Sequence, residues 1–276
     1  MALNSVNTNV GAMIALQNLQ VTNNELSQVQ NRINTGKKVS SAKDNGAIWA
    51  IAQGQRAEIG ALNAVKDSLQ RGQSAVDVSL AAGESVSDLL IQLKEKALSA
   101  TDTSLTSSAR SALNEDFKSI RDQIATVVDN AAFNGVNLLD GSSTGGFAAL
   151  ANVSGSTITV ASQDMSLSGS VVTLGASSEI NTASAATASL ALVTASIDNV
   201  GASLAKLGTG SNSLGTNLTF VGKLQDALEA GVGNLVDADL AKESARLQAL
   251  QTKQQLGVQA LSIANSSTSI LLGLFR

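Results

Sequence analysis

The sequence of 276 residues contains neither cysteine nor histidine. These absences exclude disulfides, thiolate nucleophiles, zinc sites built from Cys or His, and an imidazole general base. An enzyme with this sequence would depend on Asp, Glu, Lys, Ser and Thr alone. We therefore predict that the protein is not an enzyme and uses no cofactor or metal.

Proline and tyrosine are also absent, and aromatic residues make up only 2% of the chain. Without proline, no helix is forced to kink or end. The apolar residues are mainly Ala, Leu, Val and Ile, which suit narrow helix–helix contacts better than a thick globular core. The composition favours long helices.

A strong charge of either sign is missing too. The net charge is −4, and the longest basic cluster is Lys37-Lys38, so nucleic acid and anionic membranes are poor partners. Residues 1–5 lack the basic and apolar regions of a signal peptide. The longest apolar run, residues 270–275, is too short to cross a bilayer. We expect no interaction with nucleic acid or membrane.

The most regular feature present is a stripe of apolar residues, spaced by three and four, between Leu190 and Leu228. Only Ser211 and Gln225 interrupt it. This spacing directs a narrow face toward partner helices and predicts a left-handed supercoil. A helix over residues 190–228 would be about 58 Å long. This heptad stripe consists of Leu190, Val193, Ile197, Val200, Leu204, Leu207, Leu214, Leu218, Val221 and Leu228.

Helical periodicity also covers residues 5–34, 47–99 and 109–131, and a last helix begins near Asp237. Thr35-Gly36 is a helix-ending signal, and Asn134-Gly135 and Asp140-Gly141 are turn dipeptides. We predict a mainly α fold: a long antiparallel coiled-coil helical bundle with paired N- and C-terminal helices. A small β-rich insert is expected near the middle of the chain.

The insert is expected over residues 141–184, which are rich in Ser, Thr, Gly, Ala and Val. Short strands are predicted at residues 157–160 and 171–173, and a disordered linker is the alternative. Its hydroxyl groups are compatible with O-glycosylation, but plain polar loops are the favoured explanation. The candidate positions are Ser142, Ser143, Thr144, Thr173, Ser177, Ser178 and Thr182.

Three other features have more than one interpretation. Asp237 and Asp239 form either a carboxylate pair for chemistry or, as we favour, the capped start of a helix. Trp49 is a packing residue or an intermolecular contact. Five glycines in or beside the heptad stripe mark either close helix approach or bending, and the sequence leaves both open. They are Gly201, Gly208, Gly210, Gly215 and Gly222.

Three segments carry specific motifs. Residues 30–45 (QNRINTGKKVSSAKDN) and residues 132–141 (AFNGVNLLDG) resemble, respectively, the helix, glycine turn and SAKD pattern and the FNG…LLDG turn of the bacterial flagellin family. The run from Asp237 to Glu243 and the leucine-rich tail are similar to its terminal helix. The resemblance covers about residues 1–140 and 190–276.

The resemblance implies a filament subunit that is exported unfolded through the flagellar channel and located outside the cell. Residues 1–40 and 236–276 would form the inner coiled-coil domain, residues 41–140 and 185–235 the bundle, and residues 141–184 a surface segment. The subunit would bind copies of itself, and other flagellins, an export chaperone, and cap and hook-associated proteins are further expected partners.

We expect the apolar side chains near both termini to form the contacts between subunits in the polymer. Buried between subunits, they would drive assembly through the hydrophobic effect. They are Val10, Met13, Leu16, Leu19, Leu26, Val29, Ile33, Leu247, Leu250, Leu261, Ile270, Leu271, Leu274 and Phe275, followed by the terminal Arg276.

One segment departs from the family pattern. The stretch that the vertebrate innate flagellin receptor recognises carries an arginine in the family, and Gln92 occupies that position here. We therefore expect weak or no recognition by this receptor. The alternatives to a filament subunit are a hook–filament junction protein of the same family and a soluble coiled-coil binding module.

Overall fold

The computed structural model describes residues 8–273, with side chains up to Ser266. Its helices are α1 (Val10–Thr35), α2 (Gly46–Ala100), α3 (Ser107–Asp129), α4 (Ala183–Val236) and α5 (Leu240–Gly273). The strands are β1 (Ala132–Phe133), β2 (Val136–Asn137), β3 (Phe147–Leu150) and β4 (Thr157–Val160). The predicted mainly α fold with a small β insert is confirmed.

The chain divides into two compact units. The terminal unit consists of the chain up to Ala57 and from Ala227 onward, and the central unit runs from Glu58 to Asp226.

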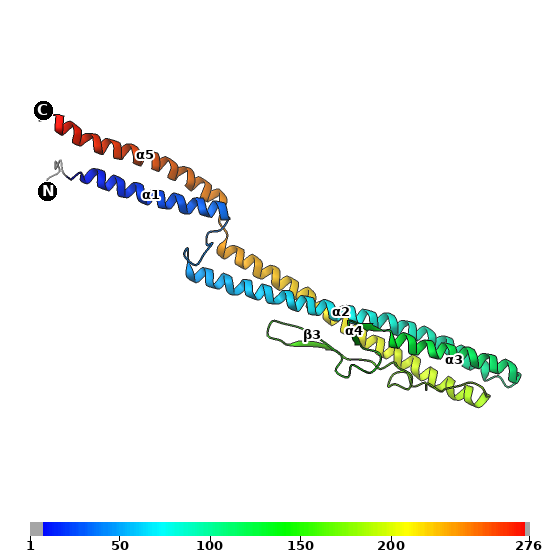
Figure 1. Ribbon diagram of the computed structural model, residues 1–276. Coiled ribbons are helices and arrows are strands. Elements are labelled where there is room, and N and C mark those ends of the chain that lie inside the picture. The colour runs from blue at the N-terminus through cyan, green and yellow to red at the C-terminus, as the bar shows by residue number, and fades with distance from the viewer. Residues whose placement is uncertain (1–7, 274–276) are drawn as a thin grey trace. The chain divides into compact units, whose positions relative to one another are not determined.

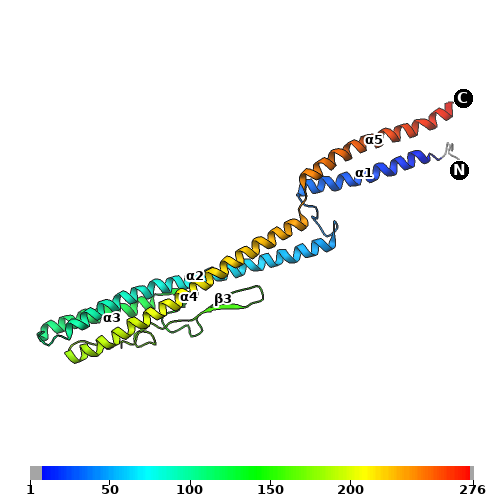
Figure 2. The same ribbon diagram turned by 180° about the vertical axis from the view of Figure 1, so that it is seen from behind.

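In the terminal unit, α1 and α5 lie side by side and antiparallel (Figures 1 and 2). Near one end of the pair, Asn9 Nδ2 donates to the carbonyl oxygen of Ala264 at 2.8 Å. Farther along, Gln254 Nε2 donates to Asn23 Oδ1 at 2.7 Å. The predicted pairing of the N- and C-terminal helices is confirmed.

The segments that follow α1 and precede α5 are hydrogen-bonded to each other. Gly36 ends α1 with a φ of +67°, as its sequence predicts. Lys38 N–H then donates to the carbonyl of Val236 at 2.7 Å, and Ala238 N–H donates to that of Gly36 at 2.9 Å. These bonds satisfy carbonyl groups at the C-terminal ends of α4 and α1 with N–H groups of the two connecting segments.

In the central unit, α2, α3 and α4 run alongside one another with the insert beside them (Figures 1 and 2). Five members of the heptad stripe, each seven positions from the next, are almost completely buried. They are Val193, Val200, Leu207, Leu214 and Val221. Such a column of buried side chains is what a coiled-coil contact requires, so the heptad stripe lies in the core of this unit.

The two polar interruptions of the heptad stripe contact polar residues of α2. Gln225 Nε2 donates to Asn63 Oδ1 at 3.0 Å, and Ser211 Oγ lies 3.4 Å from Asp77 Oδ1. The numbering rises on one helix as it falls on the other, so α2 and α4 are antiparallel. Each polar interruption of the heptad stripe therefore has a polar partner on α2.

The helix α4 is longer than the sequence predicted, with 54 residues, and it continues through all five glycines. A Cβ on Gly210 would lie 2.8 Å from Val160 Cγ1, whereas one on Gly201, Gly208 or Gly222 would meet nothing within 4 Å. Close approach therefore explains Gly210, where the insert reaches the helix, and does not explain those three.

A second buried column on α4 escaped the sequence analysis because its members are polar. Ser189, Ser196 and Ser203 are all buried, again seven positions apart. The insert is hydrogen-bonded to two of them: Ser189 Oγ donates to the carbonyl of Glu179 at 3.1 Å, and Ser196 Oγ accepts from Thr173 N–H at 3.1 Å. Small side chains here let the backbone of the insert approach the helix closely.

The insert is ordered and packed, so the disordered alternative is wrong. Its interior-facing side chains Met165, Val172, Leu174 and Ile180 are fully buried. The strand predicted at residues 157–160 is confirmed as β4, paired with β3 in an antiparallel hairpin. The turn predicted at Asn134-Gly135 is confirmed as the tight link between β1 and β2.

The strand predicted at residues 171–173 is wrong. Val171 N–H donates to the carbonyl of Asp164, and Thr173 N–H donates to the hydroxyl of Ser196. These amides are satisfied by a loop and a side chain, so the β-branched run needs no neighbouring strand.

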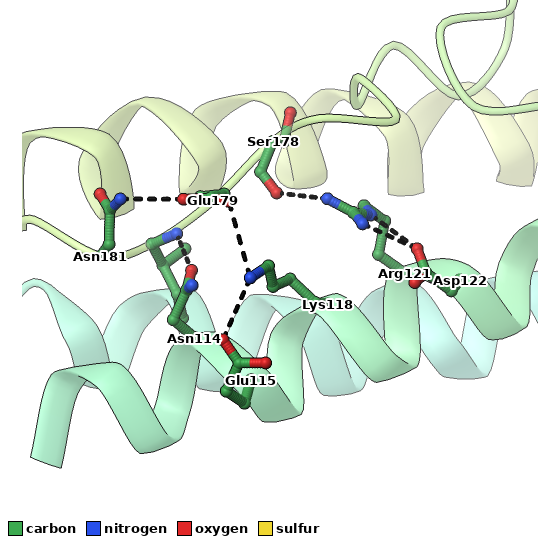
Figure 3. Close-up of polar contacts among 9 residues, drawn as sticks. Asn114, Glu115, Lys118, Arg121, Asp122, Ser178, Glu179 and Asn181 are labelled. Carbon is green, nitrogen blue, oxygen red and sulfur yellow. Dashed lines mark hydrogen bonds and ion pairs between the residues drawn. The ribbon is translucent and has the colours of Figure 1, made fainter.

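Polar side chains of α3 hold the end of the insert (Figure 3). Asn114 Oδ1 accepts from Ile180 N–H at 2.7 Å, and Arg121 Nη1 donates to the carbonyl of Ser178 at 2.9 Å. Between them, Lys118 Nζ lies 3.0 Å from Glu115 and 3.7 Å from Glu179. Hydrogen bonding to Glu115 raises the pKa of the Lys118 ammonium, with Glu179 adding to the effect.

By length and composition alone, α4 could cross a membrane. The fully buried side chains of its heptad stripe include Val200 and Leu207, so its most apolar side already has partners within the central unit.

Candidate assembly surface

The pair formed by α1 and α5 buries few of its apolar side chains. Val29 is 1% exposed and Leu250 5% exposed, whereas Met13 is 63% exposed. Val10 and Leu16 are also more than half exposed. Two helices alone cannot enclose apolar residues on several faces, so these side chains remain available to another surface.

The remaining residues expected at subunit contacts are partly exposed to solvent or lie outside the described part of the chain. Half-buried on the two helices are Leu19, Leu26, Ile33, Leu247 and Leu261. The side chains of Ile270 and Leu271, and the whole of Leu274, Phe275 and Arg276, lie outside what the structure describes. The expected role of all these residues in polymerisation remains a prediction.

On α1 and α5 the structure adds six exposed large apolar residues to those predicted from the sequence. They are Ile14, Val21, Leu240, Leu256, Val258 and Ile263. A signal for the first two was present, because Val10, Ile14 and Val21 follow one another at intervals of four and seven, which forms a second stripe on the same helix. The prediction assumed one apolar stripe per helix and therefore omitted Ile14 and Val21.

Exposed apolar and amide side chains form a shallow groove on α1. Its lining combines apolar and amide groups, and its volume is about 340 Å³. The residues are Met13, Leu16, Gln17, Gln20, Val21 and Asn24. Such a surface can receive apolar side chains while the amides hydrogen-bond around them, which is the pattern of a protein–protein contact.

Charge and close packing fix the two helices against each other. Arg32 Nη1 lies 3.1 Å from Glu243 Oε1, and Glu243 Oε2 is buried without a hydrogen-bond partner. A Cβ on Gly257 would lie 3.2 Å from Leu19 Cδ1, so glycine makes room for that leucine. These contacts orient the faces that remain exposed.

The loop after α1 is organised around the Asp44 carboxylate. Its Oδ2 accepts hydrogen bonds from the hydroxyls and the backbone N–H groups of Ser40 and Ser41. These bonds, that of the Ser40 hydroxyl foremost, lower the pKa of Asp44. The SAKD motif therefore acts as a self-capped turn.

The aspartates near the start of α5 have a structural role. Asp239 Oδ1 accepts from the backbone N–H groups of Ala241 and Lys242 at 3.1 Å, and Asp237 forms an isolated β-bridge with Lys37. Asp239 is therefore a helix cap, as favoured above. Within residues 8–273 no group of three Asp or Glu residues could hold a metal ion.

Comparisons with known proteins match both ends of the chain. A family model for the bacterial flagellin N-terminal helical region matches residues 6–144, and one for the C-terminal helical region matches residues 190–275. Flagellin FljM of Caulobacter vibrioides is 60% identical over 276 residues, covering all of both chains. The flagellin of Brucella melitensis is 40% identical over 281 residues, covering 99% of each.

Among solved structures, one of a Vibrio parahaemolyticus protein described as a flagellar hook-associated protein has a TM-score of 0.56 at 17% identity. It covers 70% of this chain and all of that one. At this identity the likeness extends to the fold alone, and nothing favours the junction protein or the soluble coiled-coil module as the function. Two family models and full-length relatives agree: the chain belongs to the bacterial flagellin family and is a structural subunit of the flagellar filament.

Proposed function

We propose that the subunit polymerises through the exposed apolar side chains of α1 and α5. The observation that carries this proposal is their exposure on a helix pair that cannot cover them: Met13 is 63% and Ile263 69% exposed. Burial between copies would remove this surface from water, which favours association by roughly 25 cal/mol per Å². We propose the same role for Ile270, Leu271, Leu274 and Phe275, whose side chains lie outside the described part of the chain.

A paired set of substitutions tests this role. Met13→Asp with Leu16→Asp places two charges on the exposed surface, whereas Asn18→Asp with Gln30→Asp places two charges at exposed polar positions of the same helix. Purified protein would be added to filament seeds and followed by electron microscopy. The first pair should abolish elongation, and the second should retain it. Equal elongation by both would refute the proposal.

The domain arrangement is part of the same proposal. Residues 1–40 and 236–276 would form the inner region of the filament, residues 41–140 and 185–235 the surrounding bundle, and residues 141–184 the outer surface. Limited proteolysis of intact filaments tests this order, because the outer segment should be cleaved first. Prior cleavage within residues 10–35 would contradict it.

We further propose that the subunit leaves the cell unfolded through the flagellar channel and acts in the extracellular filament. Other flagellins, an export chaperone, and cap and hook-associated proteins would be its partners. The absence of cysteine supports export in an unfolded state, because no disulfide can form inside the cell. Fractionation of cells with and without a working flagellar export apparatus would test the route.

Two of the seven candidate O-glycosylation positions are better placed than the rest. Thr144 and Ser177 are exposed, and their hydroxyls make no hydrogen bond to any described residue. In contrast, the Thr182 hydroxyl caps α4 and the Ser142 hydroxyl donates to Asp140. Mass spectrometry of filament peptides should find any sugar at the first two positions.

Weak recognition by the innate flagellin receptor follows from Gln92, which is exposed on α2. An amide there lacks the charge and the bidentate geometry of the family's arginine. A receptor reporter assay should show a weak response that Gln92→Arg increases. Full activation by the unsubstituted protein would contradict the expectation.

A further inference from the structure

The central unit carries an aromatic side chain that its own fold leaves in solvent. Phe220 on α4 is 60% exposed, in a sequence with only five phenylalanines. It lines an open surface hollow together with Ile158 of β4 and polar residues of α4. An exposed aromatic ring in a protein with so few aromatics is a candidate anchor for a protein–protein contact.

A different surface of the same unit offers a partly apolar groove. It lies on α2 and α3 and has a volume of about 400 Å³. Leu89 and Val127 supply its apolar walls, and Gln92, Gln123 and Asp88 supply polar groups. The groove and Phe220 belong to different helices, so one copy of the chain presents both an exposed ring and a place that could receive one.

The charges beside the two features are complementary. Lys223 follows Phe220 by three positions, which places both on the same side of α4. Asp88 lines the groove on α2. Within the part of the chain that the structure describes, neither Lys223 nor Asp88 has an ion-pair partner. Each is therefore free to pair with a neighbouring molecule.

Helical assembly of identical subunits requires this kind of arrangement. A filament grows by head-to-tail contacts in which one surface of a subunit meets a different surface of the next. We propose that Phe220 of one copy enters the α2–α3 groove of a second copy, with Lys223 facing Asp88. The inference rests on self-assembly of the subunit and names a lateral contact in addition to the terminal helices.

The register of α2 and α4 gives this contact a predicted geometry. Because Gln225 faces Asn63, Phe220 lies at the level of Ser68, five positions along each helix. The groove is centred near Asp88, a further 20 positions along α2, or about 30 Å at 1.5 Å per residue. Neighbouring copies joined in this way would be staggered by about 30 Å along the helix axes, and a ring cannot reach the groove of its own chain.

The absence of cysteine allows a direct test by cross-linking. Thr216→Cys places a thiol one turn before Phe220, and Gln92→Cys places one in the groove, while Phe220, Lys223 and Asp88 stay intact. Filaments of the double variant, treated with a short bis-maleimide, should give a ladder of covalent multimers on a denaturing gel. The control pairs Thr216→Cys with Thr103→Cys, an exposed residue in the turn between α2 and α3, and should give no ladder.

Filaments of the double variant that give no ladder would overturn the contact while leaving polymerisation intact. A ladder of equal intensity in the control would also overturn it. Failure of the unsubstituted protein to form filaments would instead refute assembly itself, so the two proposals fail in distinguishable ways.

Charge exchange provides a second test that does not depend on thiols. Phe220→Ala should raise the critical concentration for elongation about tenfold, because truncating a central aromatic anchor typically has this effect or more. Asp88→Lys should raise it as well, and adding Lys223→Asp should restore it toward the original value. Circular dichroism of the subunits should be unchanged, since all three side chains are exposed. Lack of restoration by the double variant would overturn the pairing of these two residues.

Discussion

Arg32 and Glu243 form the one ion pair that joins α1 to α5 within the described residues, with 3.1 Å between Nη1 and Oε1. Glu243 is 9% exposed, and its second carboxylate oxygen is buried without a partner. Loss of the arginine would leave the buried carboxylate charge without a partner. The resulting loss of stability is larger than the net stabilisation that the ion pair provides.

We predict that Arg32→Ala destabilises the pairing of α1 with α5 by about 1–3 kcal/mol, the range for a buried polar group that loses its hydrogen-bond partner, because the pair is only partly buried. Thermal melting of filaments and the critical concentration for elongation would measure it. Arg32→Met combined with Glu243→Leu should recover much of the loss, because two apolar groups replace the pair. If the double variant were weaker than Arg32→Ala, burial of the lone carboxylate would not be the cause.

Asn114 is buried on α3, where Oδ1 accepts the hydrogen bond of Ile180 N–H at 2.7 Å (Figure 3). Asn114→Ala should lower the free energy of unfolding of the central unit by about 1–3 kcal/mol, because a buried backbone N–H loses its acceptor. Chemical denaturation of the monomer measures the loss. The exposed neighbour Glu115 is the matched control: Glu115→Ala should change the free energy by less than about 0.5 kcal/mol.

Periodicity was sufficient to predict the helices and the pairing of the termini, because the heptad stripe and the terminal stripes are themselves apolar. It could not reveal the second column on α4, since Ser189, Ser196 and Ser203 are polar as isolated residues. Their burial depends on how the insert folds back, which no local pattern specifies. The same limit applies to Val171 to Thr173, where β-branched residues suggested a strand but tertiary contacts satisfy the backbone.

The assembly surface was predictable only in part. The stripe through Met13 and Leu16 was visible in the sequence, but apolar spacing does not say which of its members face the partner helix and which face solvent. That division depends on the register of α1 with α5, which Asn9, Arg32 and Glu243 help to set through contacts more than 200 residues apart. Phe220 and the groove near Asp88 were missed for a similar reason, because a single exposed aromatic carries no periodic signal.

Asp44 should titrate at a lower pH than an unrestrained aspartate, whose pKa is about 3.9. The Ser40 hydroxyl and the backbone N–H groups of Ser41 and Ser40 stabilise its ionised form and lower its pKa. A lowered pKa in the folded state means that the charged carboxylate stabilises the turn above the unfolded pKa, and that this contribution is lost as pH falls through the folded pKa. NMR titration of the carboxyl carbon, assigned with Asp44→Asn, should give a midpoint below the ordinary value. A midpoint at or above it would contradict the four hydrogen bonds.

Gly146 is the glycine of the insert that tolerates a side chain least. Its φ is +69°, and an added Cβ would lie 2.1 Å from the carbonyl oxygen of Val160. Because that atom belongs to the backbone of β4, it cannot rotate away as a side chain would. Gly146→Ala should therefore force β3 and β4 apart, in addition to the roughly 1 kcal/mol that a left-handed conformation costs a non-glycine residue.

Hydrogen exchange of the β3–β4 amides that face each other across the hairpin, including Ala149 and Ile158, should report the change as lost protection, whereas the helical circular dichroism should be nearly unaffected. Gly145→Ala is the matched control, since a Cβ at Gly145 meets nothing within 4 Å. Its exchange should match that of the unsubstituted chain. Equal protection in both variants would show that the hairpin accommodates a Cβ at residue 146, and the close approach to Val160 would then not constrain the insert.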